Sequence, residues 1–367
     1  MNIEKGPQLI PESRRSLPQS EYEGREKFAE GLYVSWEVAP KCDLACPHCY
    51  ALNEETGSEL REAEDQEKQF ELVTKSWMEE MPLSEISKGL DNLERVGVQD
   101  FNIEGGEPTL RKDIVDIVKA AKARGFRAHL STHGMHLLRT DKETGKPLAE
   151  QLREAGLDTM AISIDSADEE TNNRIRQKCS GEPSEHYSKA INFLQWYGKR
   201  WQETMENGEH MYRLKINTSV TRFNIDTASD VASLVRQHIP KEAYSQLKIV
   251  QFHPRGKGAE KEEELGISGD EFAWVVQEAK DKASDNLEVT ARPYKDEVYP
   301  FVVIGFRGTA VIPEGKEQKP MKVIGDDGRT EVINVRKENF YDLFKRYVKE
   351  HPSFVTENRK INTYINE

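Results

Sequence analysis

Residues 42–49 read Cys-Asp-Leu-Ala-Cys-Pro-His-Cys and hold three of the four cysteines in the chain. Clustered thiolates of this kind can face one centre, and soft sulfur ligands select zinc, copper(I) or iron–sulfur clusters. A tetrahedral zinc site needs a fourth ligand, and His48 is poorly spaced for that role. A [4Fe–4S] cluster held by Cys42, Cys46 and Cys49 would instead leave one iron open for a ligand that is not protein. The array predicts a metal centre, with a structural zinc loop as the alternative.

Length and composition describe a protein with a highly charged surface. The chain has 367 residues, 36% of them hydrophobic and 32% charged, which allows one large α/β domain with extensions or two domains. No apolar run approaches the roughly 18–20 residues that cross a bilayer, and the N-terminus does not resemble a signal peptide. We therefore expect no association with a membrane.

The cysteine count and the net charge restrict the compartment and the partners. Three adjacent cysteines and a distant fourth do not make a disulfide framework, and free thiols need a reducing compartment. The cytoplasm is therefore the expected location. The net charge of −13 argues against a duplex nucleic-acid binder, which normally presents a basic face.

Strands alternate with helices through the middle of the chain in units of roughly 30 residues. Alternating apolar and polar side chains predict strands at residues 32–38, 101–103, 127–130, 160–164, 214–220 and 247–252. Apolar residues at helical spacing predict helices at residues 84–96, 113–124, 148–155, 184–197 and 228–238. This order favours an α/β fold with a parallel sheet, and six units fit a partial, open (β/α)6 barrel better than a closed barrel.

The chain is expected to divide into three regions. Residues 1–30 are polar and turn-rich and read as an N-terminal arm, and residues 31–284 form the core. Residues 285–367 combine short apolar runs with a final helix and predict a small C-terminal α+β cap. This cap contains no cysteine, so we expect no second iron–sulfur cluster there.

Polar motifs follow the predicted strands at the edge where parallel sheets bind ligands. After the second strand, residues 104–110 read Glu-Gly-Gly-Glu-Pro-Thr-Leu. Consecutive glycines allow a ligand to approach the backbone, and the carboxylate of Glu107 can meet a cationic amine. An ordinary strand-to-helix turn is the alternative for this motif.

The cysteine array, followed by Gly105-Gly106-Glu107-Pro108, resembles the radical S-adenosylmethionine (SAM) superfamily. The resemblance covers roughly residues 30–260 and implies a partial (β/α)6 barrel of the radical SAM type. It implies one [4Fe–4S] cluster on the three cysteines, with SAM at the open iron. It also implies that Gly105, Gly106, Glu107 and Pro108 bind SAM, with Glu107 at its amino group.

The same resemblance extends to later strand ends, where it implies further cofactor-binding residues. These are Ser163 and Asp165 after the fourth strand, Arg174 or Arg176 near the SAM carboxylate, Asn217 in the fifth strand, and the backbone of Phe252 and His253 near adenine. A cap for the next helix is the alternative for Asp165, and a surface ion pair is the alternative for either arginine.

Several neighbouring polar residues have two open interpretations. His133 stands where the family often has Asn, and it is either a polar loop residue or a contact of SAM or substrate. Thr221 and Asn224 either end the fifth strand or belong to the site. Arg255 and Lys257 either bind an anionic substrate group or line a solvated turn.

Cys179 is the one thiol outside the cysteine array. A lone Cys is usually inert packing. Its position after the fourth strand, near the ligand-binding edge, supports a catalytic alternative. Some radical SAM epimerases use a thiol to give a hydrogen atom to a substrate radical, and Cys179 is the candidate for that role.

The resemblance implies reductive cleavage of SAM to a 5′-deoxyadenosyl radical, which removes a hydrogen atom from the substrate. The electron would come from an external reductant such as flavodoxin or ferredoxin. A small molecule (a sugar, a nucleotide, or a precursor of a cofactor or natural product) is the first substrate class, for epimerisation, rearrangement or bond formation. A ribosomal peptide or protein is the second. A zinc-binding interaction protein without catalysis is the alternative from another class.

Overall fold

The computed structural model describes residues 29, 31–49, 80–179, 184–283, 286–294, 302–305, 309–314, 317–324 and 330–358. The predicted N-terminal arm, residues 1–30, therefore lies almost entirely outside the described residues. Within the described part, no helix is both long and apolar enough to span a membrane.

Parallel strands form most of a ten-stranded sheet, in the order β10-β9-β8-β1-β2-β3-β4-β5-β6-β7. The six predicted strands are β1 (Tyr33–Ala39), β2 (Asp100–Gly105), β3 (Arg127–Thr132), β4 (Thr159–Ser163), β5 (Arg213–Val220) and β6 (Ser245–Gln251). Each of them pairs in parallel with the next. The α/β fold with an open parallel sheet is confirmed, because β7 and β10 are separate edges.

The C-terminal region contributes strands to the same sheet. β7 (Leu287–Arg292) pairs in parallel with β6, and β8 (Val302–Ile304) pairs in parallel with β1. β9 (Ala310–Glu314) and β10 (Glu317–Pro320) continue the sheet as antiparallel strands, whereas β11 (Lys322–Ile324) and β12 (Thr330–Val332) form a separate hairpin. The predicted α+β extension therefore flanks the six-stranded core on both sides. The boundary at residue 285 stays a prediction.

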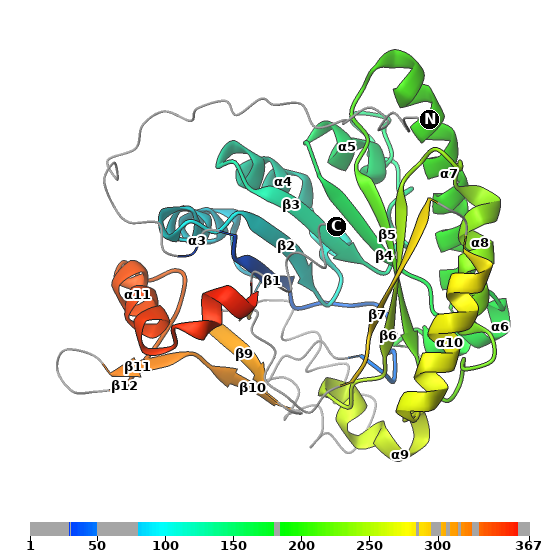
Figure 1. The fold of residues 1–367 in the computed structure, drawn as a ribbon. Helices are drawn as coiled ribbons and strands as arrows, with labels where there is room; N and C mark the ends of the chain where they lie inside the picture. The colour runs from blue at the N-terminus through cyan, green and yellow to red at the C-terminus, as the bar shows by residue number, and fades with distance from the viewer. Residues whose placement is uncertain are drawn as a thin grey trace, which may run out of the picture.

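Helices cover the outer face of the curved sheet (Figure 1). They are α3 (Leu83–Val96), α4 (Ile114–Ala123), α5 (Leu148–Glu154), α6 (Glu169–Ile175), α7 (His186–Asn207), α8 (Val231–His238) and α10 (Gly269–Lys282). The short α9 (Glu262–Leu265) lies past the end of β6, and α11 (Phe340–Glu350) lies beside the C-terminal strands. Trp36 on β1 shows how closely the helices pack on the sheet, because a Cβ on Gly89 of α3 would lie 2.3 Å from the Trp36 ring. That contact requires glycine at position 89.

The two faces of the sheet differ in polarity. Residues paired across parallel strands point to the same side, so the register defines each face. The outer face carries fully buried apolar residues such as Trp36, Phe101, Ile162 and Ile216. The inner face carries their polar sequence neighbours, including Ser35, Glu37, Asn102, Glu104, His129, Ser131, Ser163, Lys215, Asn217 and Lys248. The apolar face makes the core with the helices, and the polar face is free for chemistry.

Candidate active site

The cysteine loop follows β1 and carries Cys42, Cys46 and Cys49 at the carboxyl edge of the sheet. Cys46 is buried, and the other two are half-buried. The Cys42 sulfur accepts a hydrogen bond from the backbone N–H of Leu44 at 3.4 Å. Burial, together with the negative charges of Cys46 and Glu107, raises the pKa of the Cys42 thiol well above its usual value. Three thiolates can share this spot only with a cationic centre, so the donor set fits an iron–sulfur cluster.

Gly105 and Gly106 let the second strand end meet the cysteine loop. Gly106 N–H donates to Ala39 O at 2.7 Å, and Glu107 N–H donates to Lys41 O at 2.5 Å. A Cβ on Gly106 would lie 2.2 Å from Lys41 O, and Gly105 has a φ of +140°. The close approach of the backbone at Ala39 and Lys41 therefore requires glycine at both positions, and their role in binding SAM stays a prediction.

Glu107 ties the ends of β2 and β3 together. Its carboxylate is fully buried and accepts hydrogen bonds from Thr109 N–H at 2.9 Å, Thr132 Oγ1 at 2.6 Å and His133 N–H at 2.8 Å. It also caps the short 3₁₀ turn that begins at Pro108. Glu107 thus has the structural role in a turn that was the alternative for this motif, and its contact with the SAM amine stays a prediction.

Asp165, after β4, is the centre of a second buried group of polar residues. Arg176 Nε donates to its Oδ2 at 2.6 Å, and Ser219 N–H donates to its Oδ1 at 2.9 Å. Burial opposes ionisation of Asp165, but the charges of Arg176 and His48 keep its pKa below the usual value. The proposed alternative, that Asp165 caps the next helix, is wrong, because Asp168 caps α6 by accepting from Thr171 N–H at 2.8 Å.

Arg176 faces the cysteine loop, and Arg174 does not. Arg176 is buried, and its Nη1 lies 4.0 Å from the Cys46 sulfur. Arg174 is exposed, and its guanidinium stacks 4.4 Å above the centre of the Phe223 ring. Of the two predicted arginines, only Arg176 therefore lies where it could contact a cofactor held by the cysteines.

The remaining predicted cofactor contacts lie on β4, β5 and the loop after β6. Ser163 and Asn217 are paired on the inner face of the sheet. Phe252 is buried and hydrogen-bonds the end of β5, and Gly258 N–H, in the same loop, donates to Cys49 O at 3.4 Å. Burial, with the charges of nearby arginines, lowers the pKa of His253 to about 3. Gly258 thus links the loop after β6 to the cysteine loop, and the cofactor roles of Ser163, Asn217, Phe252 and His253 stay predictions.

Thr221 and Asn224 form a buried turn that ends β5. Asn224 Oδ1 accepts from Thr221 N–H at 2.7 Å, and Asn224 Nδ2 donates to Asp165 O at 2.6 Å. This supports the interpretation of strand termination. Arg255 is buried in the following loop, and the side chain of Lys257 lies outside the described part of the chain.

Sequence reasoning missed a cationic group on the inner face of β5, β6 and β7. Lys215 and Lys248 are half-buried there, and Arg292 lies on β7 beside β6. Burial, then the charges of Arg292 and Lys215, lowers the pKa of Lys248 to about 7. Burial, then Arg213, lowers the pKa of Lys215 to about 8. The sequence did contain a signal for this group, because each lysine lies between apolar residues of a strand. Such a lysine points away from the apolar core between sheet and helices, and so toward the inner face of the sheet.

Comparisons with known proteins identify the family. The Radical SAM superfamily model matches residues 36–225. Curated relatives include the AdoMet-dependent heme synthase of Oleidesulfovibrio alaskensis, which is 27% identical over 71% of this chain and 56% of the relative. The mycofactocin maturase MftC of Mycolicibacterium smegmatis is 27% identical over 68% of this chain and 54% of the relative. The chain thus spans about half the length of these two relatives.

One relative matches over nearly its whole length. The S-adenosylmethionine-dependent nucleotide dehydratase of a Fibrobacter species is 24% identical over 88% of this chain and 91% of the relative. Among solved structures, Streptococcus suis SuiB bound to S-adenosylmethionine has a TM-score of 0.53 at 15% identity, covering 88% of this chain and 68% of that chain. This likeness shows the shared fold. Since the family model covers more than half of its length, the chain belongs to the radical SAM superfamily, whose enzymes use a [4Fe–4S] cluster and SAM.

Proposed function

We propose that this chain cleaves SAM reductively at a cluster held by Cys42, Cys46 and Cys49 and removes a hydrogen atom from a small anionic molecule, a nucleotide first. The cationic inner face of β5, β6 and β7 carries the proposal. The nucleotide dehydratase, a relative aligned over 88% of this chain, supports the same substrate class. An external reductant such as flavodoxin or ferredoxin would supply the electron, and the cytoplasm is the expected location.

Lys248 shows why this face suits an anion. Among the described residues, no carboxylate lies within ion-pair distance of its ammonium group. The charges of Arg292 and Lys215 lower its pKa, and the charge of Glu104 raises it by less. Repulsion and burial together favour loss of its proton. A phosphate placed between these groups would reverse both effects, so part of its binding energy would come from restoring full charge to the lysines.

The chain's own residues would provide binding, orientation and exclusion of water. When the cluster and SAM are both bound, they would supply an organic radical that can remove hydrogen from an unactivated C–H bond. Arg176, held by Asp165 beside Cys46, would neutralise negative charge near the cysteine loop. The lysines on β5 and β6 would hold the anionic end of the substrate, leaving its reacting carbon toward the carboxyl edge of the sheet.

A ribosomal peptide is the second substrate class. The fold likeness to Streptococcus suis SuiB crystallised with the precursor peptide SuiA favours it, at a TM-score of 0.53 and 14% identity. A likeness at that identity concerns the fold alone. The cationic inner face has no evident use for a neutral peptide segment, so we rank the peptide below an anionic small molecule.

Lys248→Met is expected to weaken binding of nucleoside triphosphates roughly ten- to a hundredfold, because one charge-assisted hydrogen bond is lost. Isothermal titration calorimetry with triphosphates and with the corresponding uncharged nucleosides measures this. Lys88→Met is the control, since Lys88 is exposed and pairs with Glu85 at 2.7 Å. Triphosphate binding that is absent from the wild type, or unchanged in Lys248→Met, would contradict the anion site.

Cys179 lies beside the cysteine loop, and we propose it as the hydrogen-atom donor to the substrate radical. Its N–H donates to Asp43 O at 3.3 Å, and its sulfur lies 3.5 Å from Cys42 O. Cys179 is exposed, so its sulfur is not part of the core. In the proposed step the S–H bond breaks as the substrate C–H bond forms. The thiyl radical left on Cys179 then takes up an electron and a proton, the electron coming from the external reductant.

Cys179→Ser is expected to preserve substrate-dependent formation of 5′-deoxyadenosine but to stall or divert the product. The hydroxyl O–H bond is too strong to give up its hydrogen atom to a carbon radical. Mass spectrometry of products formed in deuterated water checks this, since a thiol exchanges its hydrogen with solvent. An unchanged product distribution, without deuterium in the wild-type product, would remove Cys179 from the mechanism.

A further inference from the structure

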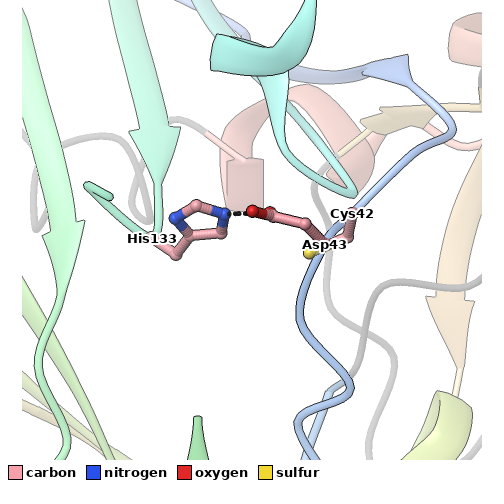
Figure 2. Close-up of side chains that lie close together, drawn as sticks. All are labelled: Cys42, Asp43 and His133. Atoms are coloured by element: carbon pink, nitrogen blue, oxygen red, sulfur yellow. Dashed lines mark hydrogen bonds and ion pairs between the residues drawn. The ribbon is translucent and has the colours of Figure 1, made fainter. Parts of the chain in front are cut away.

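Asp43 joins the cysteine loop to two histidines from the end of β3. Figure 2 shows its carboxylate facing the ring of His133, with Cys42 next to it on the loop. Asp43 Oδ1 lies 2.8 Å from His133 Nε2, and Asp43 Oδ2 lies 2.9 Å from His136 Nε2. Both carboxylate oxygens are thus engaged by histidines from one loop. Because Asp43 directly follows Cys42, these contacts restrain the residue that carries a predicted cluster ligand.

The protonation of His133 follows from its other contacts. Met135 N–H donates to His133 Nδ1 at 3.1 Å, so Nε2 carries the hydrogen and donates it to Asp43. Asp43 thus offers one carboxylate oxygen to each of two histidine rings, which is a strong, charge-assisted arrangement.

His133 also contacts Glu107, at the centre of the Gly-Gly-Glu-Pro motif. His133 N–H donates to Glu107 Oε2 at 2.8 Å, and its ring Nε2 lies 3.3 Å from the same oxygen. The single residue His133 thus touches both the cysteine loop and the predicted SAM-binding motif. Its position fixes the distance and direction between the two.

A buried chain of hydrogen bonds runs from this contact to Asp165, which lies near the other end of the cysteine loop. His186 Nε2 donates to His133 O at 2.8 Å, and Asn172 Nδ2 donates to His186 Nδ1 at 2.9 Å. Asn172 Oδ1 accepts from Asp165 N–H at 3.0 Å. Asp165 Oδ2 in turn lies 3.5 Å from the Nε2 of His48, which stands between Cys46 and Cys49 in the sequence. Residues near both ends of the cysteine loop therefore contact one connected group of buried side chains.

We propose that Asp43 is a positioning residue: gripped by His133 and His136, it aims the cysteine loop, and with it the open iron of the cluster, at the SAM site beside Glu107. The proposal is independent of the substrate. It separates two roles within the loop, because the cysteines would hold the cluster while Asp43 sets its direction. Loss of Asp43 should therefore weaken SAM binding without loss of iron.

Asp43→Ala, His136→Ala and the double variant test this in anaerobically reconstituted protein. The readout is the change that SAM produces in the electron paramagnetic resonance spectrum of the reduced cluster, titrated with SAM alone. We expect full iron content in all three, and roughly tenfold more SAM needed for half of the change in Asp43→Ala. The double variant should be no worse than Asp43→Ala, because the hydrogen bond that His136→Ala removes is one of the two that Asp43→Ala already removes. Asp43→Asn should recover part of the affinity, since an amide oxygen still accepts one bond.

His210→Ala is the matched control, because the His210 ring bonds Leu157 O at 3.0 Å just before β4 and β5 begin, at the edge of the sheet opposite the cysteine loop. Hydrogen exchange of the cluster-free proteins adds a readout that does not depend on loading. Backbone N–H groups of residues 43–49 should exchange faster in Asp43→Ala and at the wild-type rate in His210→Ala. Normal SAM affinity in iron-replete Asp43→Ala or His136→Ala would overturn the proposal, as would additive losses in the double variant.

Discussion

Replacement of Cys42, Cys46 or Cys49 by Ala is expected to abolish the brown colour of the reconstituted protein and its cleavage of SAM. Each variant leaves only two cysteines on the loop. The pKa of the Cys42 thiol is raised by burial and by its neighbours' charge, so thiolates form here only against the positive charge of a metal centre. Removal of one ligand therefore removes the centre. Iron and sulfide analysis, visible absorption and an assay for 5′-deoxyadenosine measure the three consequences.

Cys179→Ala is the matched control, because Cys179 lies beside the same loop but outside the predicted ligand set. It should retain about four irons per chain, as the wild type does, since one [4Fe–4S] cluster is expected. About eight irons in the wild type would contradict a single cluster. Cleavage of SAM retained in any one loop variant would remove that cysteine from the ligand set.

Local patterns in the sequence were enough to predict the fold and the edge of the sheet at which the site lies. Alternation in β1 separated Val34 and Trp36 from Ser35 and Glu37, and these residues lie on opposite faces of the sheet. The polar motifs fall at carboxyl ends of parallel strands because the crossover connections bring those ends to one edge. Both inferences need only neighbours in sequence and the geometry of a strand.

The choice between Arg174 and Arg176 depended on where a short helix ends. Arg174 lies in the last turn of α6, whereas Arg176 is the residue just after its end. Sequence alone could not fix this, because the two arginines flank the same apolar residue, Ile175, and helix boundaries are the least certain part of a sequence-based assignment. The structure places Arg176 inward and Arg174 on Phe223.

Long-range contacts account for what the sequence could not predict. β8 lies beside β1, although more than two hundred residues separate them in the chain. Asp43 and His133 are 90 residues apart, and neither has a local pattern that names the other. The Gly105-Gly106 pair was recognised as a close-approach site, but whether a ligand or a backbone approaches depends on the packing of the cysteine loop.

Asp165→Ala is expected to lower the free energy of unfolding by about 3–5 kcal/mol, the cost of leaving one partner of a buried ion pair alone. Arg176 is buried, and its only carboxylate within ion-pair distance in the described structure is Asp165, at 2.6 Å. The change also removes the acceptor of Ser219 N–H. Urea denaturation of the cluster-free protein, followed by circular dichroism, measures the loss without interference from iron.

Asp168→Ala is the control for this ion pair, because Asp168 lies three residues further on and caps a helix instead. Its side chain caps α6 at the surface, so its loss should cost only about 0.5–2 kcal/mol. A double change, Asp165→Leu with Arg176→Met, should recover much of the stability lost in Asp165→Ala, because no buried charge then remains unpaired. Equal losses in Asp165→Ala and Asp168→Ala would show that the Asp165–Arg176 pair contributes little to folding. In that case the conspicuous burial of both charges beside Cys46 would have to be explained by the cofactor site alone.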